Sequence, residues 1–212
     1  MRGITSSIHS TFNGIVTGDP SKDKTDFSVW TQDANIGASS EELLKMFDTV
    51  DTVLLGRGTY EDLTRKWPFV KDWPGVDDVG LRLGEKINNA SKLVVTGDHP
   101  LDELTWGEFT APEQLTGDDI EEQIKDLKNS DGDDIVIFGS PTLVRSLTDA
   151  NLIDEYQIFV HPVVVNEGEH LFDNLKKRKD FRLVDVKAFE HSAMLVTYAP
   201  AKVPAHDTLP SY

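Results

Sequence analysis

The chain contains no cysteine among its 212 residues. This absence excludes disulfide bonds, thiolate catalysis and cysteine-ligated metals, and it is typical of a protein from a reducing compartment. Basic residues are also few. The chain has 21 lysines and arginines but 37 aspartates and glutamates, which gives a net charge of −16. Such a surface repels phosphate backbones and anionic lipids, so we expect neither nucleic acid nor a membrane as a partner.

Long apolar runs are missing as well. No stretch reaches the roughly 18 apolar residues of a membrane span, and residues 1–9 lack the apolar core of a secretory signal. We therefore predict a cytoplasmic protein. The histidines do not have the spacing of metal ligands, so no metal site is expected, and His9 and His161 are interpreted as core histidines.

Apolar strand patterns alternate with helix patterns along most of the chain. The strand patterns cover residues 3–9, 52–55, 92–97, 134–139 and 153–165. The helix patterns cover residues 39–47, 59–67, 79–90, 117–130 and 140–150. A capping box of Ser39 and Glu42 is expected to begin the first helix, and residues 181–189 and 193–199 are predicted to form a hairpin.

This order predicts an α/β fold, with a mixed, mostly parallel sheet flanked by helices and an antiparallel hairpin at its C-terminal end. We expect a single domain over residues 1–200. Residues 201–212 are predicted to be a flexible tail, which contains Pro204 and Pro210.

Glycine follows three of the predicted strands, in "LLGRGT", "VVTGD" and "IFGSPTL". Ligands of parallel α/β sheets bind beyond the carboxyl ends of the strands, where glycine lets a phosphate approach the backbone and a helix start offers free N–H groups. Arg57 adds a charge-assisted contact to the first junction. The three junctions therefore predict a dinucleotide site. Ordinary turns remain the alternative, since neither G-x-G-x-x-G nor the P-loop pattern is present.

Five stretches carry a resemblance to a known family. They are "STFNGIVTG", "VDTVLLGRGTYE", "KLVVTG", "DIVIFGSPTLVRSL" and "LIDEYQIFVHPVVVNEGEHLF". In this order they resemble the dihydrofolate reductase-like superfamily, in particular the C-terminal reductase domain of the riboflavin-biosynthesis deaminase–reductase. The resemblance implies a sheet that binds NADPH at its strand ends. The implied function is hydride transfer to a small nitrogen heterocycle, either a pterin or an aminopyrimidine.

The resemblance also implies which residues contact the cofactor. The loop expected to cover the nicotinamide contains Asn13, Gly14 and Ile15, and the strand end expected near the adenine contains Thr96 and Gly97. The turn expected at the pyrophosphate and the adenosine side contains Gly56, Arg57 and Thr59. The second turn expected at the pyrophosphate contains Gly139, Ser140, Pro141, Thr142 and Leu143. The stretch "TYEDLTRKW" replaces the family's Asp-Asn-Pro run, which favours a reductase-like relative over the riboflavin enzyme itself.

No catalytic residue is predicted. Glu41 or Glu42 occupies the place of the carboxylate that dihydrofolate reductases carry on their first helix, but helix capping and the helix dipole explain these acids as well. Water is an alternative proton source. A non-catalytic module for nucleotide binding or sensing is the alternative function, because both would share the cofactor contacts.

Two further expectations concern Arg57 and self-association. Arg57 is predicted to bind the 2′-phosphate or the pyrophosphate of NADPH, and an ion pair with Glu61 is the structural alternative. A homodimer is expected from the resemblance and from the apolar strand "YQIFVHPVVV", which would be an aggregation hazard at a bare sheet edge. The alternative is that this strand lies inside the sheet.

Overall fold

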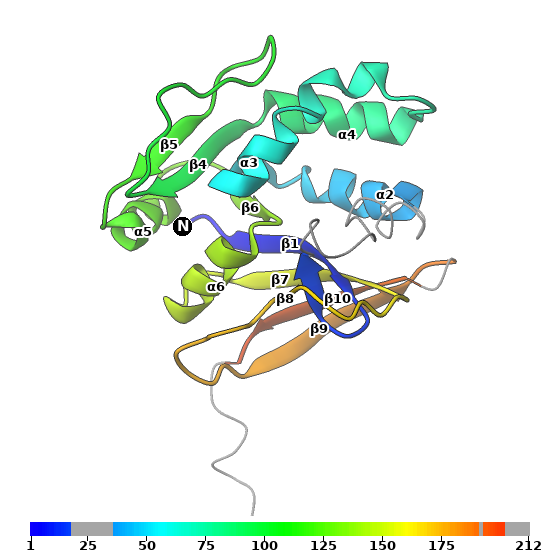
Figure 1. Ribbon diagram of the computed structural model, residues 1–212, viewed down its shortest axis with the longest axis vertical. Helices are drawn as coiled ribbons and strands as arrows, with labels where there is room; N and C mark the ends of the chain where they lie inside the picture. The colour runs from blue at the N-terminus through cyan, green and yellow to red at the C-terminus, as the bar shows by residue number, and fades with distance from the viewer. Residues whose placement is uncertain (18–35, 191–192, 202–212) are drawn as a thin grey trace, which may run out of the picture.

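A computed structural model describes residues 1–17, 36–190 and 193–201. An eight-stranded sheet runs through the molecule in the order β5-β4-β3-β6-β1-β7-β10-β9 (Figure 1). Its strands are β1 (Ile4–Thr11), β3 (Val50–Gly56), β4 (Ser91–Gly97), β5 (Glu113–Thr116), β6 (Asp134–Phe138), β7 (Glu155–His161), β9 (Phe181–Ala188) and β10 (Met194–Pro200). Only β10 runs antiparallel to its neighbours, so the predicted mixed, mostly parallel sheet with a terminal hairpin is confirmed.

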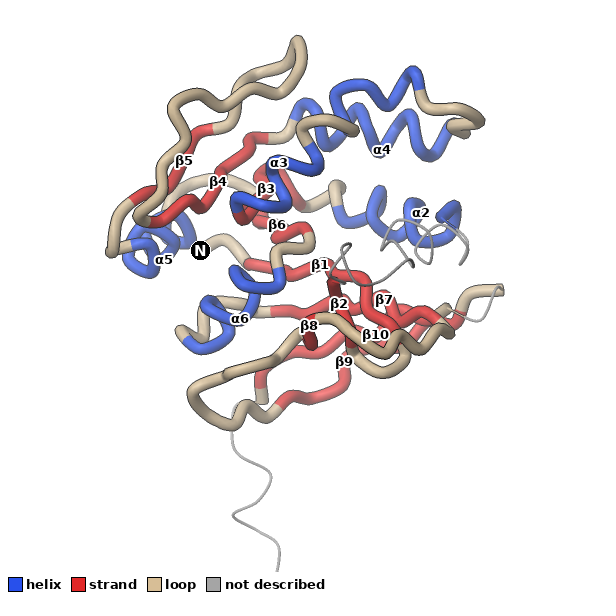
Figure 2. The backbone as a smooth tube through the Cα atoms, in the orientation of Figure 1, coloured by secondary structure: helices blue, strands red, loops and turns tan. Residues whose placement is uncertain are grey.

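Helices lie on both faces of the sheet (Figure 2). They are α2 (Ile36–Met46), α3 (Arg57–Leu63), α4 (Asp78–Asn89), α5 (Ile120–Asn129) and α6 (Pro141–Asp149), with a 3₁₀ helix at Trp67–Asp72. The helices α5 and α6 pack on one face, in a core that includes Ile124 and Leu147. The helices α2 and α4 pack on the other, in a core that includes Phe47 and Ile87. Two separate cores therefore hold the sheet between two helical layers.

The sequence of β3 explains its central position. Leu54 packs in the core under α5 and α6, whereas Val53 and Leu55 pack in the core under α2 and α4. A strand that buries successive side chains on opposite faces has apolar residues throughout, as parallel strands covered by helices require. Each buried leucine contributes about 1.5–3 kcal/mol to folding. Burial of both faces thus fixes β3 in the middle of the parallel part.

The structure corrects three local predictions. The first helix begins at Ile36, so Ser39 lies inside it and the predicted capping box is wrong. The strand predicted over residues 153–165 ends at His161, where Pro162 follows and has no N–H to continue the ladder. This strand lies between β1 and β10 and not at an edge. The alternative, that this strand lies inside the sheet, is therefore confirmed, and one of the two reasons for expecting a homodimer, a bare edge at this strand, is wrong.

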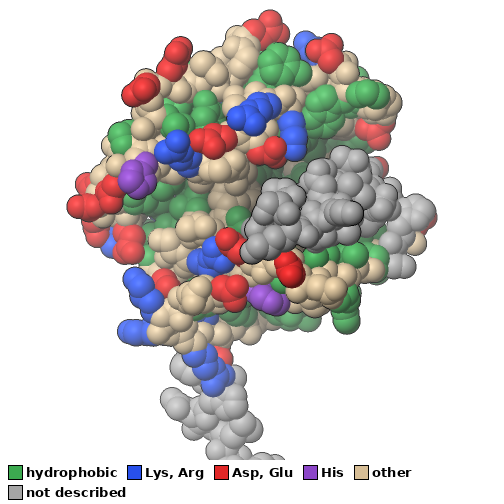
Figure 3. Space-filling view, in the orientation of Figure 1, with side chains coloured by type: hydrophobic (Ala, Val, Ile, Leu, Met, Phe, Trp, Pro, Cys, Tyr) green, Lys and Arg blue, Asp and Glu red, His purple; other side chains and the backbone are tan. Residues whose placement is uncertain are grey.

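The three shortest strands were not predicted from the sequence. β5, and the two-stranded sheet formed by β2 (Ile15–Thr17) with β8 (Glu169–His170), have no apolar alternation long enough to identify them. The predicted tail covers residues 201–212, of which residues 202–212 lie outside the described residues. Figure 3 shows acidic side chains scattered over the visible face, consistent with the composition.

Candidate functional site

The three glycine junctions lie side by side at one edge of the sheet. The strands β4, β3 and β6 are parallel neighbours, so their carboxyl ends bring Gly97, Gly56 and Gly139 to the same edge. Gly97 and Gly139 have φ angles of +56° and +53°, which glycine adopts without steric cost. The strand β1 follows β6 in the sheet and carries the loop from Asn13 to Ile15 to this edge. All the predicted cofactor segments are thus arranged along one line.

Two of these junctions are joined by side-chain hydrogen bonds. The Ser140 hydroxyl oxygen accepts from the Gly56 amide at 2.7 Å and lies 2.8 Å from the Thr59 hydroxyl. The Thr59 hydroxyl also accepts from the Ser140 amide at 3.1 Å. Ser140 has a left-handed backbone, with φ 52° and ψ 62°, which costs a residue other than glycine energy and is concentrated at functional sites. Thr59 and Ser140 therefore shape the edge, with their hydroxyl groups already bonded to each other.

The first turn of α6 carries backbone amides that lie before the first intrahelical hydrogen bond. Pro141 has no N–H, and the first intrahelical bond runs from the Val144 amide to the Ser140 carbonyl. The amides of Thr142 and Leu143 precede that bond, so they point out of the helix end and are available to a phosphate. The Leu143 side chain is buried, so this residue offers only its backbone. The predicted residues of this turn thus divide into amide donors and packing groups.

Sequence reasoning missed Arg145, one turn further along α6. Its guanidinium donates to Glu169 at 2.8 Å, to the His170 carbonyl at 3.1 Å and to the Thr142 hydroxyl at 3.2 Å. These contacts attach α6 to β8 beside the first turn of α6. The spacing of Arg145 from Thr142 was the available signal, because residues three apart share a helix face.

Arg57 lies at this edge, but it is already paired. Its Nε donates to Glu61 at 2.9 Å and its Nη1 to the His99 carbonyl at 3.4 Å. The ion pair is about half exposed, at 46% for Arg57 and 44% for Glu61, so solvent weakens it. The structural alternative for Arg57 is thus present, and the guanidinium is still accessible to a phosphate that would replace Glu61.

The residues predicted to contact the adenine, Thr96 and Gly97, already make hydrogen bonds within the protein. Thr96 is buried, and its hydroxyl donates to the Leu115 carbonyl at 3.3 Å and to the Gln114 amide oxygen at 3.2 Å. The Gly97 carbonyl accepts from the Gly117 amide at 3.1 Å. Thr96 therefore fixes β4 to β5, and the side of β4 nearest a ligand is the backbone of Gly97.

The loop predicted to cover the nicotinamide is held rigidly. The Asn13 amide nitrogen donates to the Val165 carbonyl at 2.8 Å, and its oxygen accepts from the Thr11 hydroxyl at 2.9 Å. The Thr11 hydroxyl accepts from the Ile15 amide at 2.8 Å. The Ile15 side chain is buried, and Gly14 has φ +85°. Asn13 is exposed, but its side-chain amide is bonded within the protein, and Gly14 is partly exposed.

Neither glutamate of α2 is poised as an acid. Glu41 is exposed. Burial acts to raise the pKa of Glu42, but hydrogen bonds from Lys187 at 2.6 Å and Lys45 at 2.8 Å outweigh it and bring this pKa below its ordinary value. Glu42 is therefore a paired carboxylate at neutral pH and is not set up to donate a proton.

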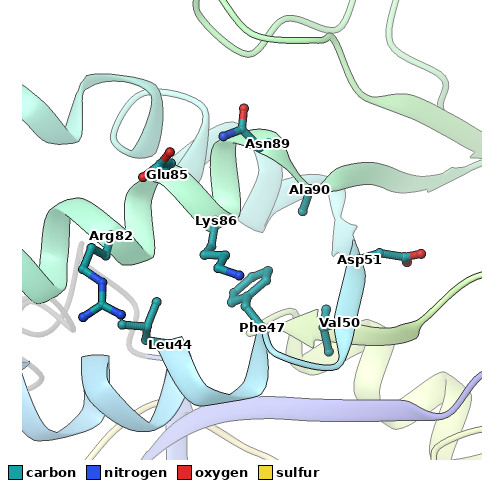
Figure 4. A pocket seen from close by; sticks show the side chains of 9 residues that line it. All are labelled: Leu44, Phe47, Val50, Asp51, Arg82, Glu85, Lys86, Asn89 and Ala90. Atoms are coloured by element: carbon teal, nitrogen blue, oxygen red, sulfur yellow. The ribbon is translucent and has the colours of Figure 1, made fainter.

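A cavity of about 400 Å³ lies elsewhere, between α2 and α4 (Figure 4). Phe47, Val50 and Ala90 line it, with Arg82 and Lys86 from α4. It adjoins the first residues of β3, whereas Gly56 is the last, so the cavity is at the opposite end of that strand from the glycine junctions. None of the predicted cofactor residues lines it.

The comparison with known proteins identifies the family. A model of the RibD C-terminal domain matches residues 14–195. The chain belongs to this family. YyaP of Bacillus subtilis, an uncharacterized protein, is 26% identical over 149 residues, which cover 70% of this chain and 73% of YyaP. The relation to riboflavin-type reductase domains inferred from the sequence is thereby confirmed.

Solved structures show the same fold. A proposed riboflavin biosynthesis protein from Shewanella sp. PV-4 superposes with a TM-score of 0.69 at 19% identity, over 95% of this chain and all of that one (100%). Dihydrofolate reductase from Enterococcus faecalis, complexed with NADP(H), superposes with a TM-score of 0.57 at 15% identity, over 93% and 96% of the two chains. The dihydrofolate reductase-like fold is therefore confirmed.

Two features are absent from the part of the chain that the structure describes. No helix among them is long and apolar enough to cross a membrane. In the same part of the chain, no group of three or more histidine, aspartate or glutamate side chains is placed to hold a metal ion.

Proposed function

We propose that this RibD-type domain is an NADPH-dependent reductase that transfers hydride to a small nitrogen heterocycle of the pterin or aminopyrimidine type. One observation carries the proposal: three glycine junctions on adjacent parallel strands meet the amino end of α6 at one edge of the sheet. Membership of the RibD C-terminal domain family and the dihydrofolate reductase-like fold support it.

The residues at the edge fit this cofactor. The Thr142 and Leu143 amides would bind the pyrophosphate, and Arg57 would bind it or the 2′-phosphate. Gly97 and Gly139 let the cofactor approach the backbone, and Gly14 would do the same for the nicotinamide. The bound cofactor supplies the hydride, and the protein has to hold the two rings face to face and exclude water.

Turnover distinguishes the reductase from the alternative, a non-catalytic nucleotide-binding module. The paired state of Glu42 favours the alternative, since Lys187 and Lys45 already hold this carboxylate. We expect pterins or aminopyrimidines to cause oxidation of NADPH, which is measured as the loss of NADPH absorbance. Measurable NADPH binding without turnover of any such ring would favour the module.

Arg57→Ala is expected to weaken NADPH binding by about ten- to a hundredfold, because a hydrogen bond to a charged group contributes about 1.5–3 kcal/mol. Titration calorimetry with NADPH and NADH locates the contact. A loss confined to NADPH places Arg57 on the 2′-phosphate, and an equal loss for both places it on the pyrophosphate. Glu61→Gln is the matched control, which releases Arg57 and should bind NADPH at least as tightly as the wild type. Unchanged affinity in Arg57→Ala would make this arginine purely structural.

We also propose a homodimer, now through β9 in place of β7. β9 is one of the two edge strands of the eight-stranded sheet, and its Leu183, Val184 and Val186 residues are 57%, 44% and 48% exposed. An edge strand with exposed apolar side chains readily pairs with another chain. Sedimentation at micromolar concentration and moderate salt should therefore show a dimer, and Val184→Lys should shift it towards the monomer. A wild-type monomer of 23.6 kDa would contradict this proposal.

A further inference from the structure

Two histidines contact each other on neighbouring strands. Nδ1 of His9, on β1, lies 2.8 Å from Nε2 of His161, the last residue of β7. The His9 ring also stacks on Phe159, with 4.9 Å between the ring centroids and 18° between the planes. Phe159 in turn stacks on Phe189 at 6.4 Å. The two histidines form one hydrogen-bonded unit at the end of an aromatic row.

The sheet register places this unit on the face that α2 covers. Ile8 packs under α5 and α6, so the next residue, His9, points to the opposite face. On that face, His9 is followed across the sheet by Phe159, Leu195 and Lys187. Glu42 of α2 bonds Lys187 at 2.6 Å, so this helix reaches across the row. The histidine pair therefore lies on the side of the sheet that α2 covers.

The pair is also next to the proposed cofactor loop. His161 is the register partner of Thr11, and the Thr11 hydroxyl holds both Asn13 and Ile15. A ring bound against His9 would therefore be close to Gly14, where the proposed function places the nicotinamide. On this side Glu42 of α2 is paired with Lys187 of β9 and with Lys45 of its own helix, and β9 also carries Asp185 on the same face as Lys187.

Both imidazoles are neutral at pH 7. Burial, with a contribution from His161, lowers the pKa of His9 to about 3, and burial lowers the pKa of His161 to about 4. A neutral pair shares one proton across the Nδ1···Nε2 contact. If His9 donates it, His9 Nε2 is an acceptor; if His161 donates it, His9 Nε2 carries a proton and is a donor. His161 thus determines which role His9 Nε2 has.

We propose that the His9–His161 pair is the polar wall of the substrate subsite, with His9 Nε2 hydrogen-bonded to the edge of the heterocycle and His161 setting the tautomer of His9. His9 makes no other hydrogen bond within the described residues, and its side chain is partly exposed. A pair that switches between donor and acceptor without gaining charge is suited to a neutral ring amide. The assignment rests on the proposed function for the position of the nicotinamide, and makes His9 a binding residue and His161 a positioning residue.

The first test uses the wild-type chain with ¹⁵N-labelled histidine, followed by nuclear magnetic resonance. Pterin and 5-aminouracil serve as probes, each added with and without saturating NADPH. We expect one of them to shift the His9 Nε2 resonance and to change the proton distribution in the His161 ring. His99, which is exposed at the β4 end of the edge, is the internal control and should not respond to the probe.

The second test compares variants by calorimetry with the same probes. His9→Phe keeps the stack on Phe159 and removes the nitrogen, so probe affinity should fall by at least about tenfold while NADPH affinity is unchanged. His9→Gln should restore part of the loss, and His161→Phe should weaken the probe without affecting NADPH. Each variant is checked by its unfolding temperature, and the wild-type spectra do not depend on the variants folding.

Two outcomes would overturn the assignment: neither probe binds, or a probe binds and leaves His9 unchanged. Failure of the proposed function has a different signature, because NADPH would then fail to bind in the titration without probe. A shift of His9 by a probe in the absence of NADPH binding would retain the subsite and reject the reductase.

Discussion

Gly139→Val should abolish measurable NADPH binding, with at least about a hundredfold loss of affinity. Gly139 has φ +53°, and a β-branched side chain is rarely found there. A Cβ at this position would lie 3.6 Å from the Thr59 side chain, which is an ordinary contact distance, so the disturbance comes from the backbone. Valine would shift the chain out of the left-handed conformation and move the turn that leads into Ser140. The amides at the start of α6 would then be displaced from the positions in which they are proposed to bind the pyrophosphate.

The fold should survive this change. A strained backbone of this kind costs about 1–3 kcal/mol, which is less than the about 5–15 kcal/mol by which domains are stable. Calorimetry measures the binding, and thermal unfolding checks the fold. Gly58→Ala is the matched control: Gly58 is in α3, and a Cβ there meets nothing within 4 Å, so binding should be unchanged. A Gly139→Val protein that binds NADPH normally would exclude the β6–α6 junction from the cofactor site.

Lys92→Met should lower the free energy of unfolding by about 2–4 kcal/mol. Lys92 is buried at the start of β4, and its ammonium donates to the carbonyls of Ile87, Asn88 and Ala90 at 3.1, 2.8 and 2.7 Å. These carbonyls belong to the C-terminal end of α4, where the negative end of the helix dipole also attracts the positive charge of Lys92. The ammonium also lies 5.1 Å from the centre of the Trp106 ring. Methionine keeps the apolar part of the side chain, so the loss of stability measures the contribution of the Lys92 ammonium group and its hydrogen bonds.

Burial lowers the pKa of Lys92 to about 8, so the group is still mainly protonated at neutral pH and can donate all three bonds. Urea denaturation at pH 7 measures the change. Lys86→Met is the control, because Lys86 is exposed on the same helix and its replacement should change stability by no more than about 0.5 kcal/mol. Equal losses in the two variants would show that Lys92 contributes no more than a surface lysine.

The local patterns were informative where an element makes its own contacts. The apolar residues of β3 and the helical spacing of α4 act over a few neighbours, and both elements were predicted close to their observed bounds. The short strands β2, β5 and β8 were not, because each is a strand only through its pairing with a distant segment.

The sequence by itself determined the class of the fold, the order of the longer strands and helices, and the placing of glycine after β3, β4 and β6. These properties follow from side-chain periodicity and from the conformational freedom of glycine, which act locally. The tertiary structure alone decided the order of strands in the sheet, and hence that β7 is internal and β9 exposed. It also decided the partners of functional side chains, since Thr59 meets Ser140 and His9 meets His161 across 81 and 152 residues of chain. Such contacts depend on how the crossovers bring distant segments together, and no short stretch of sequence contains that information.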